Sequence, residues 1–521
     1  MDFLHKLLTN YSLSEEEYYA LTRPVHLFDL PDPRLFLRMD EAVSLIKKTI
    51  RQHKKIIVYG DYDCDGVMST TILVHALRKM GADVGYYIPS RYQDGYGINR
   101  KMIDAFNDKQ YKLIITVDNG ISQIEEIAYA RQLGIDVIVT DHHTVGQKIP
   151  DANYILHPQY SAYSQLYSCG AYVSLMLAST LLNRYDEYEV FLASIATISD
   201  MMPLQEHNRT LVRIGINLYN ERHFAPIYEL IQLETINEET IGMSIAPKIN
   251  AVGRIIEDKK VNYLVQFLLS DSKREIVTFS NWIKEINLTR QTLLKETISE
   301  GNDEIIVHDG ALIAVSNTKE GLIGLLAARY MNLYHLPTIV FCPTEQDPLV
   351  YKGSARADNG FSIVHAFKNL EHYLLNFGGH KAAGGCSISR DQLTAFSKAF
   401  NELAKQPMDI IDNDASIAIA LDDINWTNFY TMDTFRPFGI GFAKPLFRIE
   451  HVATSALSFI KDGQHISTLI KNDVKILGFN ITQETLKSYD KITVYGEMNL
   501  NEFRGRKSLI YQISDWQNEN F

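Results

Sequence analysis

The chain has 521 residues, 46% of them hydrophobic and 22% charged, which is typical of a globular protein with two to four domains. Its formal net charge of −12 gives no general sign of nucleic-acid binding, so any DNA contact must come from a local basic groove. No apolar run approaches the length of a membrane span and the N-terminus lacks the layout of a signal peptide, so we expect a cytoplasmic protein without membrane contact.

The first part of the chain predicts an α/β domain behind a helical lead-in. Residues 1–55 are expected to be mostly helical, with a break at Leu30-Pro-Asp-Pro33. From Ile56 to about Asp200, short β-branched runs alternate with stretches of helical spacing such as residues 67–80. This alternation predicts a parallel sheet with helices on both faces, within a domain of residues 56–269. Ligands bind at the carboxyl ends of the strands in such sheets.

Acidic and histidine side chains gather in four segments of this domain, and three of the segments directly follow a β-branched run. They are Asp61-Tyr-Asp-Cys-Asp-Gly66, Val117-Asp-Asn-Gly120, Asp141-His-His143 and Ser199-Asp200. Strand ends that bring carboxylates and imidazoles to one edge of a sheet predict a metal site. Aspartate and histidine without a thiolate favour Mn²⁺ or Mg²⁺ over structural zinc.

The spacing within these segments indicates a site for two ions. Asp63 and Asp65 stand two apart in the turn that leaves a strand, so both carboxylates can face one point, and Gly66 lets the backbone pass behind them before the helix starts. Asp118, His142 and Asp200 bring the set to five ligands. Such a set can hold two metals about 3.5–4 Å apart, the spacing for in-line phosphoryl displacement. Any one segment alone would be read as a solvated turn or a helix cap.

Two further units follow. A polar helical stretch over residues 270–301 predicts a long helix that connects to a smaller α/β unit over residues 302–405. Beyond Asp412, short strand-like runs alternate with turns such as Lys461-Asp-Gly-Gln464. This texture predicts a small β-barrel over residues 412–521.

Several motifs resemble those of one enzyme family. Tyr59-Gly-Asp-Tyr-Asp-Cys-Asp-Gly66, Val117-Asp-Asn-Gly120 and Asp141-His-His143 resemble the signatures of the DHH phosphoesterases, and Phe377-Gly-Gly-His-Lys-Ala-Ala-Gly384 resembles that of their DHHA1 domain. Similarity to the RecJ branch rests on Asp94-Gly-Tyr-Gly97, Ile249-Asn-Ala-Val-Gly-Arg254, Ser354-Ala-Arg356, Arg436-Pro-Phe-Gly-Ile-Gly441 and Phe503-Arg-Gly-Arg506. The resemblance implies a parallel-sheet DHH domain, a connecting helix, a DHHA1 domain and a C-terminal OB-fold. Because the chain ends soon after that fold, the extra C-terminal domain of some relatives is expected to be absent.

The resemblance implies a single-stranded-DNA-specific 5′→3′ exonuclease of DNA repair and recombination, which releases mononucleotides by two-metal hydrolysis. It assigns the metal ions, two Mn²⁺ with Mg²⁺ as the alternative, to Asp63, Asp65, Asp118, His142 and Asp200. Asp118 would bridge the two ions, and Asp61 is either an outer ligand or a turn carboxylate. His143 would hydrogen-bond the scissile phosphate, and Asp141 would orient a neighbouring imidazole. Tyr59 stands where the family often has histidine, so one metal would lack a nitrogen ligand.

The resemblance also implies substrate contacts. Arg356 with Ser354, and secondly Arg91, would bind the 5′ phosphate, although each arginine alone would be read as a surface residue. Arg254 would lie near the scissile phosphate or form a buried ion pair. The remaining contacts would come from Gly378, Gly379, His380, Arg504 and Arg506. Aromatic residues beside Arg504 and Arg506 would stack bases, but Tyr511 and Trp516 fit a barrel core equally well.

Partners and rival functions follow from the same resemblance. The partner would be single-stranded DNA with a 5′ phosphate, joined by a helicase and a single-strand-binding protein, and the chain would be a monomer. The rivals are a DHH phosphodiesterase acting on nanoRNA or small nucleotides, a manganese pyrophosphatase, and a catalytically inactive binding scaffold. The C-terminal OB-fold disfavours the first two, and the complete ligand set disfavours the third.

Overall fold

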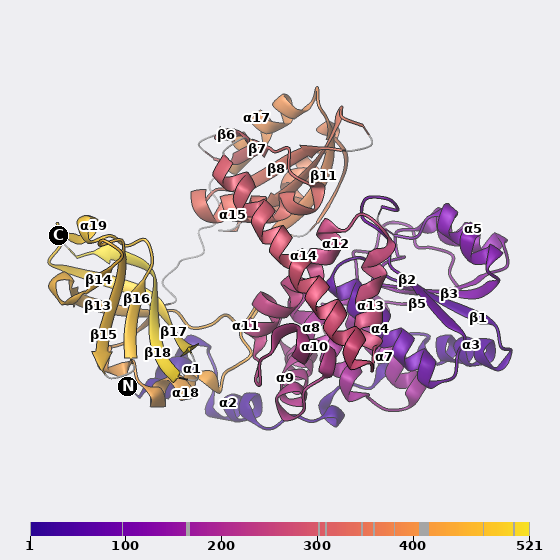
Figure 1. The fold of residues 1–521 in the computed structure, drawn as a ribbon, viewed down its shortest axis with the longest axis horizontal. Helices are drawn as coiled ribbons and strands as arrows, with labels where there is room; N and C mark the ends of the chain where they lie inside the picture. The colour runs from indigo at the N-terminus through magenta and orange to yellow at the C-terminus, as the bar shows by residue number, and fades with distance from the viewer. Residues whose placement is uncertain are drawn as a thin grey trace. The chain divides into compact units, whose positions relative to one another are not determined.

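The computed structural model describes residues 2–95, 97–162, 167–300, 303–307, 310–344, 347–357, 360–379, 381–405, 416–471, 474–503 and 506–519 (Figure 1). The chain divides into two compact units. The large unit comprises residues 30–202 and 214–411, and the terminal unit comprises residues 1–29, 203–213 and 412–521. The lead-in of residues 1–55 is thus shared between the two units.

The first sheet of the large unit is parallel throughout, with the strand order β2-β1-β3-β4-β5. Its strands are β1 (Lys55–Tyr59), β2 (Val84–Tyr87), β3 (Tyr111–Val117), β4 (Asp136–Thr140) and β5 (Tyr154–Leu156). The central strands are buried and rich in isoleucine and valine, as expected where helices cover both faces of a sheet. The prediction of a parallel α/β domain is confirmed.

Helices pack against this sheet and against one another. Helices α5 (Arg100–Asp108) and α6 (Ile124–Gln132) share a hydrophobic cluster with Ile57, Tyr59 and Ile114 of the strands. Helices α4 (Cys64–Lys79), α7 (Gly170–Leu182) and α8 (Glu187–Ser199) form a second layer in which almost every side chain is buried. The other helices of this region are α3 (Met39–Arg51), α10 (Ala225–Ile231), α11 (Glu238–Thr240), the π-helix η4 (Ile241–Ile245), α12 (Ala246–Ile255) and α13 (Tyr263–Leu269). Helix α9 (Glu206–Glu221) begins in the terminal unit and ends in the large unit.

Helix α4 begins earlier than predicted. The sequence places the first helical residue after Gly66, whereas the helix starts at Cys64 with Asp63 as its N-cap. The Asp63 carboxylate accepts a hydrogen bond from the amide of Gly66 at 3.0 Å, which satisfies one of the amides that a helix leaves unpaired at its N-terminus. Asp65 therefore lies in the first helical turn, where it is buried.

The predicted connecting helix is α14 (Lys273–Glu300), a single helix of 28 residues. It leads to a six-stranded mixed sheet of order β10-β11-β9-β8-β7-β6. The strands are β6 (Glu304–Val307), β7 (Leu312–Val315), β8 (Thr338–Pro343), β9 (Val350–Arg356), β10 (Leu374–Gly379) and β11 (Ala383–Ser389). Helices α15 (Glu320–Tyr334), α16 (Ile363–Asn369) and α17 (Leu393–Ala404) complete this part. Its separate hydrophobic clusters agree with a smaller α/β domain.

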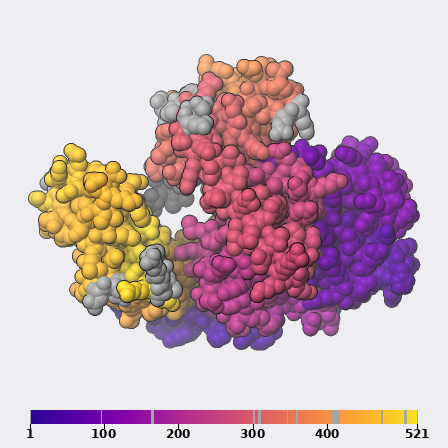
Figure 2. All heavy atoms as spheres, in the orientation of Figure 1, coloured from indigo at the N-terminus to yellow at the C-terminus, as the bar shows by residue number. Residues whose placement is uncertain are grey.

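The terminal unit carries a seven-stranded sheet of order β12-β13-β17-β18-β16-β15-β14, drawn as a yellow body in the space-filling view (Figure 2). Its elements are β12 (Ile417–Ala418), α18 (Trp426–Asp433), β13 (Phe447–Ala453), β14 (Phe459–Ile460), β15 (His465–Lys471), β16 (Val474–Gly478), α19 (Gln483–Leu486), β17 (Lys491–Phe503) and β18 (Arg506–Asn518). Residues 461–464 form the predicted turn, between β14 and β15.

Two N-terminal helices belong to this unit. Helix α1 (Phe3–Asn10) adds Phe3, Leu7 and Leu8 to the core of the β-rich fold, and α2 (Glu15–Thr22) follows it. Tyr511 is fully buried and its hydroxyl donates to the carbonyl of Phe447 at 2.8 Å. It is therefore a core residue and is not available for base stacking. Among the described residues, no helix has both the length and the apolar run that a bilayer crossing requires.

Candidate functional site

The four acidic and histidine segments meet at the carboxyl edge of the first sheet. Nε2 of His142 lies 3.1 Å from Oδ1 of Asp118, 3.5 Å from Oδ2 of Asp65 and 3.6 Å from Oδ2 of Asp200. Asp61, Asp63 and Asp118 also bring carboxylate oxygens within 4.8 Å of one another. These residues follow β1, β3, β4 and the end of α8. The folding of a parallel sheet thus brings together side chains that are up to 139 positions apart in the chain.

Asp65 is held by the start of another helix. Its two oxygens accept hydrogen bonds from the backbone amides of Gly170 and Ala171, at 2.6 and 2.7 Å. These amides open helix α7, where the helix dipole favours a carboxylate. The close approach depends on glycine, because a Cβ atom at Gly170 would lie 2.6 Å from Cβ of Asp118. Gly170 therefore lets α7 reach both Asp65 and Asp118.

Asp118 has a left-handed backbone, with φ of 61°. Its amide donates to the carbonyl of Thr140 on the adjacent strand at 3.0 Å. Aspartate tolerates this conformation better than most residues, and such conformations gather at functional sites. The turn directs the Asp118 carboxylate toward the other acidic residues.

Asp141 orients the two histidines that follow it. Its oxygens accept hydrogen bonds from the amides of Ile121, His142 and His143 and face Nδ1 of His143 at 2.8 Å. Although burial opposes both shifts, the Asp141–His143 hydrogen bond and their opposite charges lower the pKa of Asp141 to about 2 and raise the pKa of His143 to about 9. The contact at 2.8 Å holds the His143 ring with Nδ1 directed toward Asp141.

The electrostatics of the cluster call for a cation. Burial, followed by repulsion from neighbouring carboxylates, raises the pKa of Asp61 to about 8 and of Asp65 to about 6, and also raises the pKa values of Asp118 and Asp200. One buried oxygen on each of Asp61, Asp118 and Asp200 accepts no hydrogen bond from any donor in the described residues. Unsatisfied buried oxygens of like charge are costly. A divalent ion would supply both the charge and the coordination, so these residues fit Mn²⁺ or Mg²⁺.

Tyr59 takes no part in this cluster. Its ring is fully buried between Tyr87 and Phe106, and its hydroxyl donates to the carbonyl of Gly97 at 2.9 Å. Its hydroxyl is thus engaged away from the acidic residues, in the hydrophobic cluster with α5 and α6.

Asn250 is a supporting residue that the analysis of the sequence did not single out. Its Oδ1 accepts from the amide of Cys64 at 2.8 Å, and its Nδ2 donates to Oγ of Ser199 at 3.3 Å. Cys64 lies between Asp63 and Asp65, and Ser199 precedes Asp200. Asn250 therefore connects the start of helix α4 to the end of helix α8, the two helix ends that carry these carboxylates. The only signal in the sequence was its place in the Ile249–Arg254 motif.

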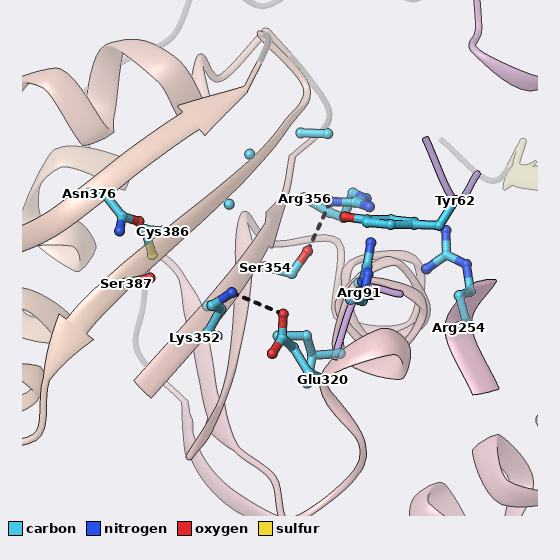
Figure 3. A pocket seen from close by; sticks show the side chains of 16 residues that line it. Tyr62, Arg91, Arg254, Glu320, Lys352, Ser354, Arg356, Asn376, Cys386 and Ser387 are labelled. Carbon is cyan, nitrogen blue, oxygen red and sulfur yellow. Dashed lines mark hydrogen bonds and ion pairs between the residues drawn. The ribbon is translucent and has the colours of Figure 1, made fainter. Parts of the chain in front are cut away.

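A pocket of about 430 Å³ collects the predicted phosphate-binding residues (Figure 3). Arg91 and Arg254 enter it from the first α/β part, and Ser354 and Arg356 enter it from β9. Nη1 of Arg356 donates to Oγ of Ser354 at 3.2 Å. We name this cavity the arginine pocket. Its wall also includes Gly384, the last residue of the Phe377–Gly384 motif. Glu320, Lys352 and Gly385 line it as well, and the sequence analysis predicted none of these three as a site residue.

The arginine pocket adjoins the acidic cluster through Tyr62. This residue lines the pocket and stands between Asp61 and Asp63 in the chain. The guanidinium of Arg91 lies 4.6 Å from the centre of the Tyr62 ring, a cation–π contact. Burial, with repulsion from Arg91 and Arg356, lowers the pKa of Arg254 to about 10. Cations crowded in this way favour an anionic ligand.

Arg254 also connects the two α/β parts of the large unit. Its Nη1 donates to the carbonyl of Gly321 at 3.1 Å, and its own carbonyl accepts from the Tyr92 hydroxyl at 2.6 Å. No carboxylate in the described residues forms an ion pair with Arg254 within 4 Å. The alternative of a buried ion pair is therefore not observed.

Other predicted substrate residues lie elsewhere. Gly378 and Gly379 end strand β10 and are exposed, outside the wall of the arginine pocket. Arg506 begins β18 of the terminal unit and is also exposed. His380 and Arg504 lie outside the described residues.

Family sequence models match three segments of the chain. The N-terminal domain of the DHH family matches residues 55–200, the DHHA1 domain matches residues 308–406, and the RecJ OB domain matches residues 415–515. The single-stranded-DNA-specific exonuclease RecJ of Bacillus subtilis is 31% identical over 508 residues, which are 94% of this chain but 64% of that protein. The Escherichia coli protein of the same name is 31% identical over 410 residues, 71% of this chain and 70% of that protein.

Solved structures have a similar fold. RecJ from Thermus thermophilus in complex with Mn²⁺ superposes with a TM-score of 0.83 at 25% identity, covering 100% of this chain and 76% of that one. An exonuclease RecJ bound to manganese gives a TM-score of 0.59 at 29% identity, covering 74% of this chain and 97% of that one.

Proposed function

This chain belongs to the RecJ family of DHH phosphoesterases, and on that premise we propose that it is a metal-dependent exonuclease that degrades single-stranded DNA from the 5′ end. One observation carries the proposal. The Asp61–Asp63 loop contributes carboxylates to the acidic cluster and, through Tyr62, a wall of the arginine pocket. A cation site and an anion site thus adjoin one another, as cleavage of a phosphodiester next to a terminal phosphate requires.

Two divalent ions would be held by Asp63, Asp65, Asp118, His142 and Asp200, with Asp61 as an outer ligand. Asp118 is the candidate for the shared ligand, because its oxygens lie near both His142 and the Asp61–Asp63 loop. When bound, such ions lower the pKa of water and neutralise charge at phosphorus. Mn²⁺ is the proposed ion, with Mg²⁺ as the alternative.

His143 would contact the scissile phosphate through Nε2. Its Nδ1 proton is directed to Asp141 at 2.8 Å, so that the imidazolium presents its second N–H away from that carboxylate. A charged donor of this kind forms a strong hydrogen bond to a phosphate oxygen. Asp141 acts here as a positioning residue, since it holds the ring and keeps it protonated.

The arginine pocket would bind the terminal 5′ phosphate. Arg356 and Arg91 offer planar guanidinium groups, and Ser354 offers a hydroxyl at the same place. Arg254 is near enough to Asp63 for that carboxylate to act on its pKa, and it would contact the scissile phosphate. A fixed separation between this pocket and the metal cluster would set a step of one nucleotide.

The two α/β parts of the large unit both line the pocket, so the strand would thread between them. We propose that this restriction excludes duplex DNA, and that Arg506 and its neighbours in the OB domain contact the strand further along. Equal degradation of duplex and single-stranded substrates would argue against the threading. We also propose that the protein is a cytoplasmic monomer that works with a helicase and a single-strand-binding protein, which co-purification from cells would test.

The test uses single-stranded DNA labelled at the 5′ or the 3′ end and incubated with Mn²⁺. Immediate mononucleotide release from the 5′ label, with a 3′-labelled ladder that shortens one nucleotide at a time, is expected. Asp118→Asn should lose at least about 10³-fold in rate while retaining its melting temperature, since it removes a charge that both ions would share. Inert DNA combined with cleavage of dinucleotides would instead assign the chain to the small-nucleotide phosphodiesterases.

A further inference from the structure

A second cavity lies beside the arginine pocket. It has a volume of about 490 Å³, within the usual range for small-molecule sites. Its lining comes from the loop after β2 with Arg91 and Tyr92, from the start of helix α15, and from β9 and the segment before it. We name this cavity the second pocket. The residues that line the second pocket but not the arginine pocket have no role in the proposed cleavage.

The two pockets share a wall. Arg91, Glu320 and Lys352 line both cavities. Glu320 and Lys352 form an ion pair at 3.2 Å, visible as a dashed line beside Arg91 in Figure 3. Lys352 keeps 46% and Glu320 25% of its side chain exposed, so this pair is solvated and weak. Two of the three side chains of the partition, Glu320 and Lys352, can therefore move.

Arg91 is the member of this wall that faces a phosphate in the proposed reaction. Its side chain lines both cavities. Because a guanidinium group carries five N–H donors, Arg91 can donate to an anion on either side of the partition.

The second pocket has the chemistry of a weaker nucleotide site. Its cations are Arg91, Lys319 and Lys352, against the carboxylates of Glu320 and Asp347. The arginine pocket has four cations against one carboxylate. The second pocket also offers the Tyr92 ring and the apolar side chains of Pro343 and Val350 to a planar base.

We propose that the second pocket receives the nucleoside 5′-monophosphate released by each cleavage, which leaves the arginine pocket past Arg91. This inference rests on the proposed exonuclease function. After cleavage, the arginines that hold the product phosphate must accept the next 5′ end, while the strand occupies the path of entry. A second pocket of lower positive charge gives the product another way out and holds it more weakly than the site it leaves.

The test measures how many dAMP molecules the full chain binds with Mn²⁺ present, by equilibrium dialysis. Wild type should bind one more dAMP than the variant Val350→Trp, whose indole would fill the second pocket. Leu349→Trp is the matched control, because this neighbour is 59% exposed and does not line the cavity. The control should bind as many dAMP molecules as wild type.

A second variant tests the same inference without a bulky substitution. Lys319 is 40% exposed and pairs with Glu257 at 2.6 Å, so Lys319→Glu should fold normally and weaken the second dAMP site by at least 10-fold. After one turnover on 5′-phosphorylated DNA, rapid filtration should find less of the newly formed mononucleotide retained on either variant than on wild type. Cleavage of the first nucleotide should stay within about 2-fold of wild type, since neither residue lines the arginine pocket.

Equal dAMP stoichiometry in wild type and Val350→Trp, or an unchanged second site in Lys319→Glu, would overturn the inference. Failure of the product site and failure of the proposed exonuclease function give different results. A protein that degrades DNA but lacks the additional dAMP refutes the product site alone. A protein that binds the additional dAMP but degrades no DNA refutes the exonuclease assignment and the origin of the ligand, and leaves only a nucleotide site.

Discussion

Replacing Gly170 by alanine tests whether the acidic cluster depends on the close approach of helix α7. The added Cβ would lie 2.6 Å from Cβ of Asp118 and 2.7 Å from its Oδ1, whereas ordinary contacts begin at 3.4 Å. To reach the ordinary contact distance of 3.4 Å from 2.6 Å, the two residues must separate by about 0.8 Å. The same shift would disturb the bond from the Gly170 amide to Asp65. One substitution thus displaces two proposed metal ligands without removing either.

The expected loss follows from that displacement. A misplacement of about 1 Å costs roughly 10²-fold in rate, and loss of support for a metal ligand costs about 10–100-fold in metal affinity. Stability should change less. Overpacking costs about 1–3 kcal/mol, offset by about 0.4–1 kcal/mol from the stiffer unfolded chain. Gly170→Ala should therefore remain folded, with a melting temperature a few degrees lower.

The assay combines Mn²⁺ titration calorimetry, thermal unfolding and single-turnover cleavage of 5′-phosphorylated single-stranded DNA. Gly146→Ala is the matched control, since this exposed glycine has no atom closer than 3.8 Å to an added Cβ. If Gly170→Ala keeps its rate within 3-fold and its Mn²⁺ affinity unchanged, the positions of Asp65 and Asp118 do not control the chemistry. The reasoning about the cluster would then be refuted.

Three further predictions concern separate parts of the molecule. Arg356→Ala should weaken binding of 5′-phosphorylated strands by about 10–100-fold, because one charged hydrogen bond contributes about 1.5–3 kcal/mol. Binding of 5′-hydroxyl strands should not change, and affinity measurements on strands that differ only in the 5′ phosphate test both statements. Asn250→Ala should lower Mn²⁺ affinity about 10-fold and recover most of its rate at saturating Mn²⁺, because it positions the ligand loops without contacting metal. Burial lowers the pKa of His207 to about 4, so the folded state resists protonation and should lose stability as pH falls from about 6.5 to 4. His207→Gln should reduce that loss, which is at most about 3 kcal/mol for a difference of about 2.5 between the two pKa values.

The first of these predictions has a matched control variant, and the other two have outcomes that would contradict them. The exposed Arg390 is the control for Arg356, since it lies in the same α/β part but outside the pocket. For Asn250, a rate that stays low at saturating Mn²⁺ would show a catalytic rather than a positioning role. For His207, the measured quantity is the difference in unfolding free energy between variant and wild type at each pH. A difference that does not change between pH 4 and 7 would contradict the buried neutral imidazole.

Much of the site was predictable because each motif is local in the sequence. The order of strand and polar loop in Ile56–Gly66 already determines that carboxylates emerge at a sheet edge, since parallel strands end on the same side. The segments at Asp118 and Asp141 follow the same rule, whereas Ser199-Asp200 lies at the end of helix α8. The position of Arg356 in its motif also pointed to phosphate. The start of helix α4 was wrong by three residues because the sequence alone did not show that Asp63 caps the helix.

Other features required the tertiary structure. Asn250 lies 186 positions from Cys64, and no periodicity connects the two. The same holds for Gly170, whose role appears only when α7 packs beside Asp118. Tyr511 fitted both a barrel core and a base-stacking surface, and only its burial and its bond to Phe447 decided between them.

The sequence by itself determined the parallel α/β architecture and the delivery of aspartate and histidine side chains to one edge of the sheet, because these depend on residue types at short spacing. The prediction of phosphate-binding arginines came from the resemblance to the RecJ branch. Tertiary structure alone decided that Arg91, Arg254 and Arg356 share one pocket, that Arg91 also borders a second, and that Asp65 is anchored by the start of α7. These facts depend on where segments far apart in the chain come to lie. Local preference and hydrophobic spacing place a residue on a helix or a strand, but only the packing of distant elements decides which side chains meet.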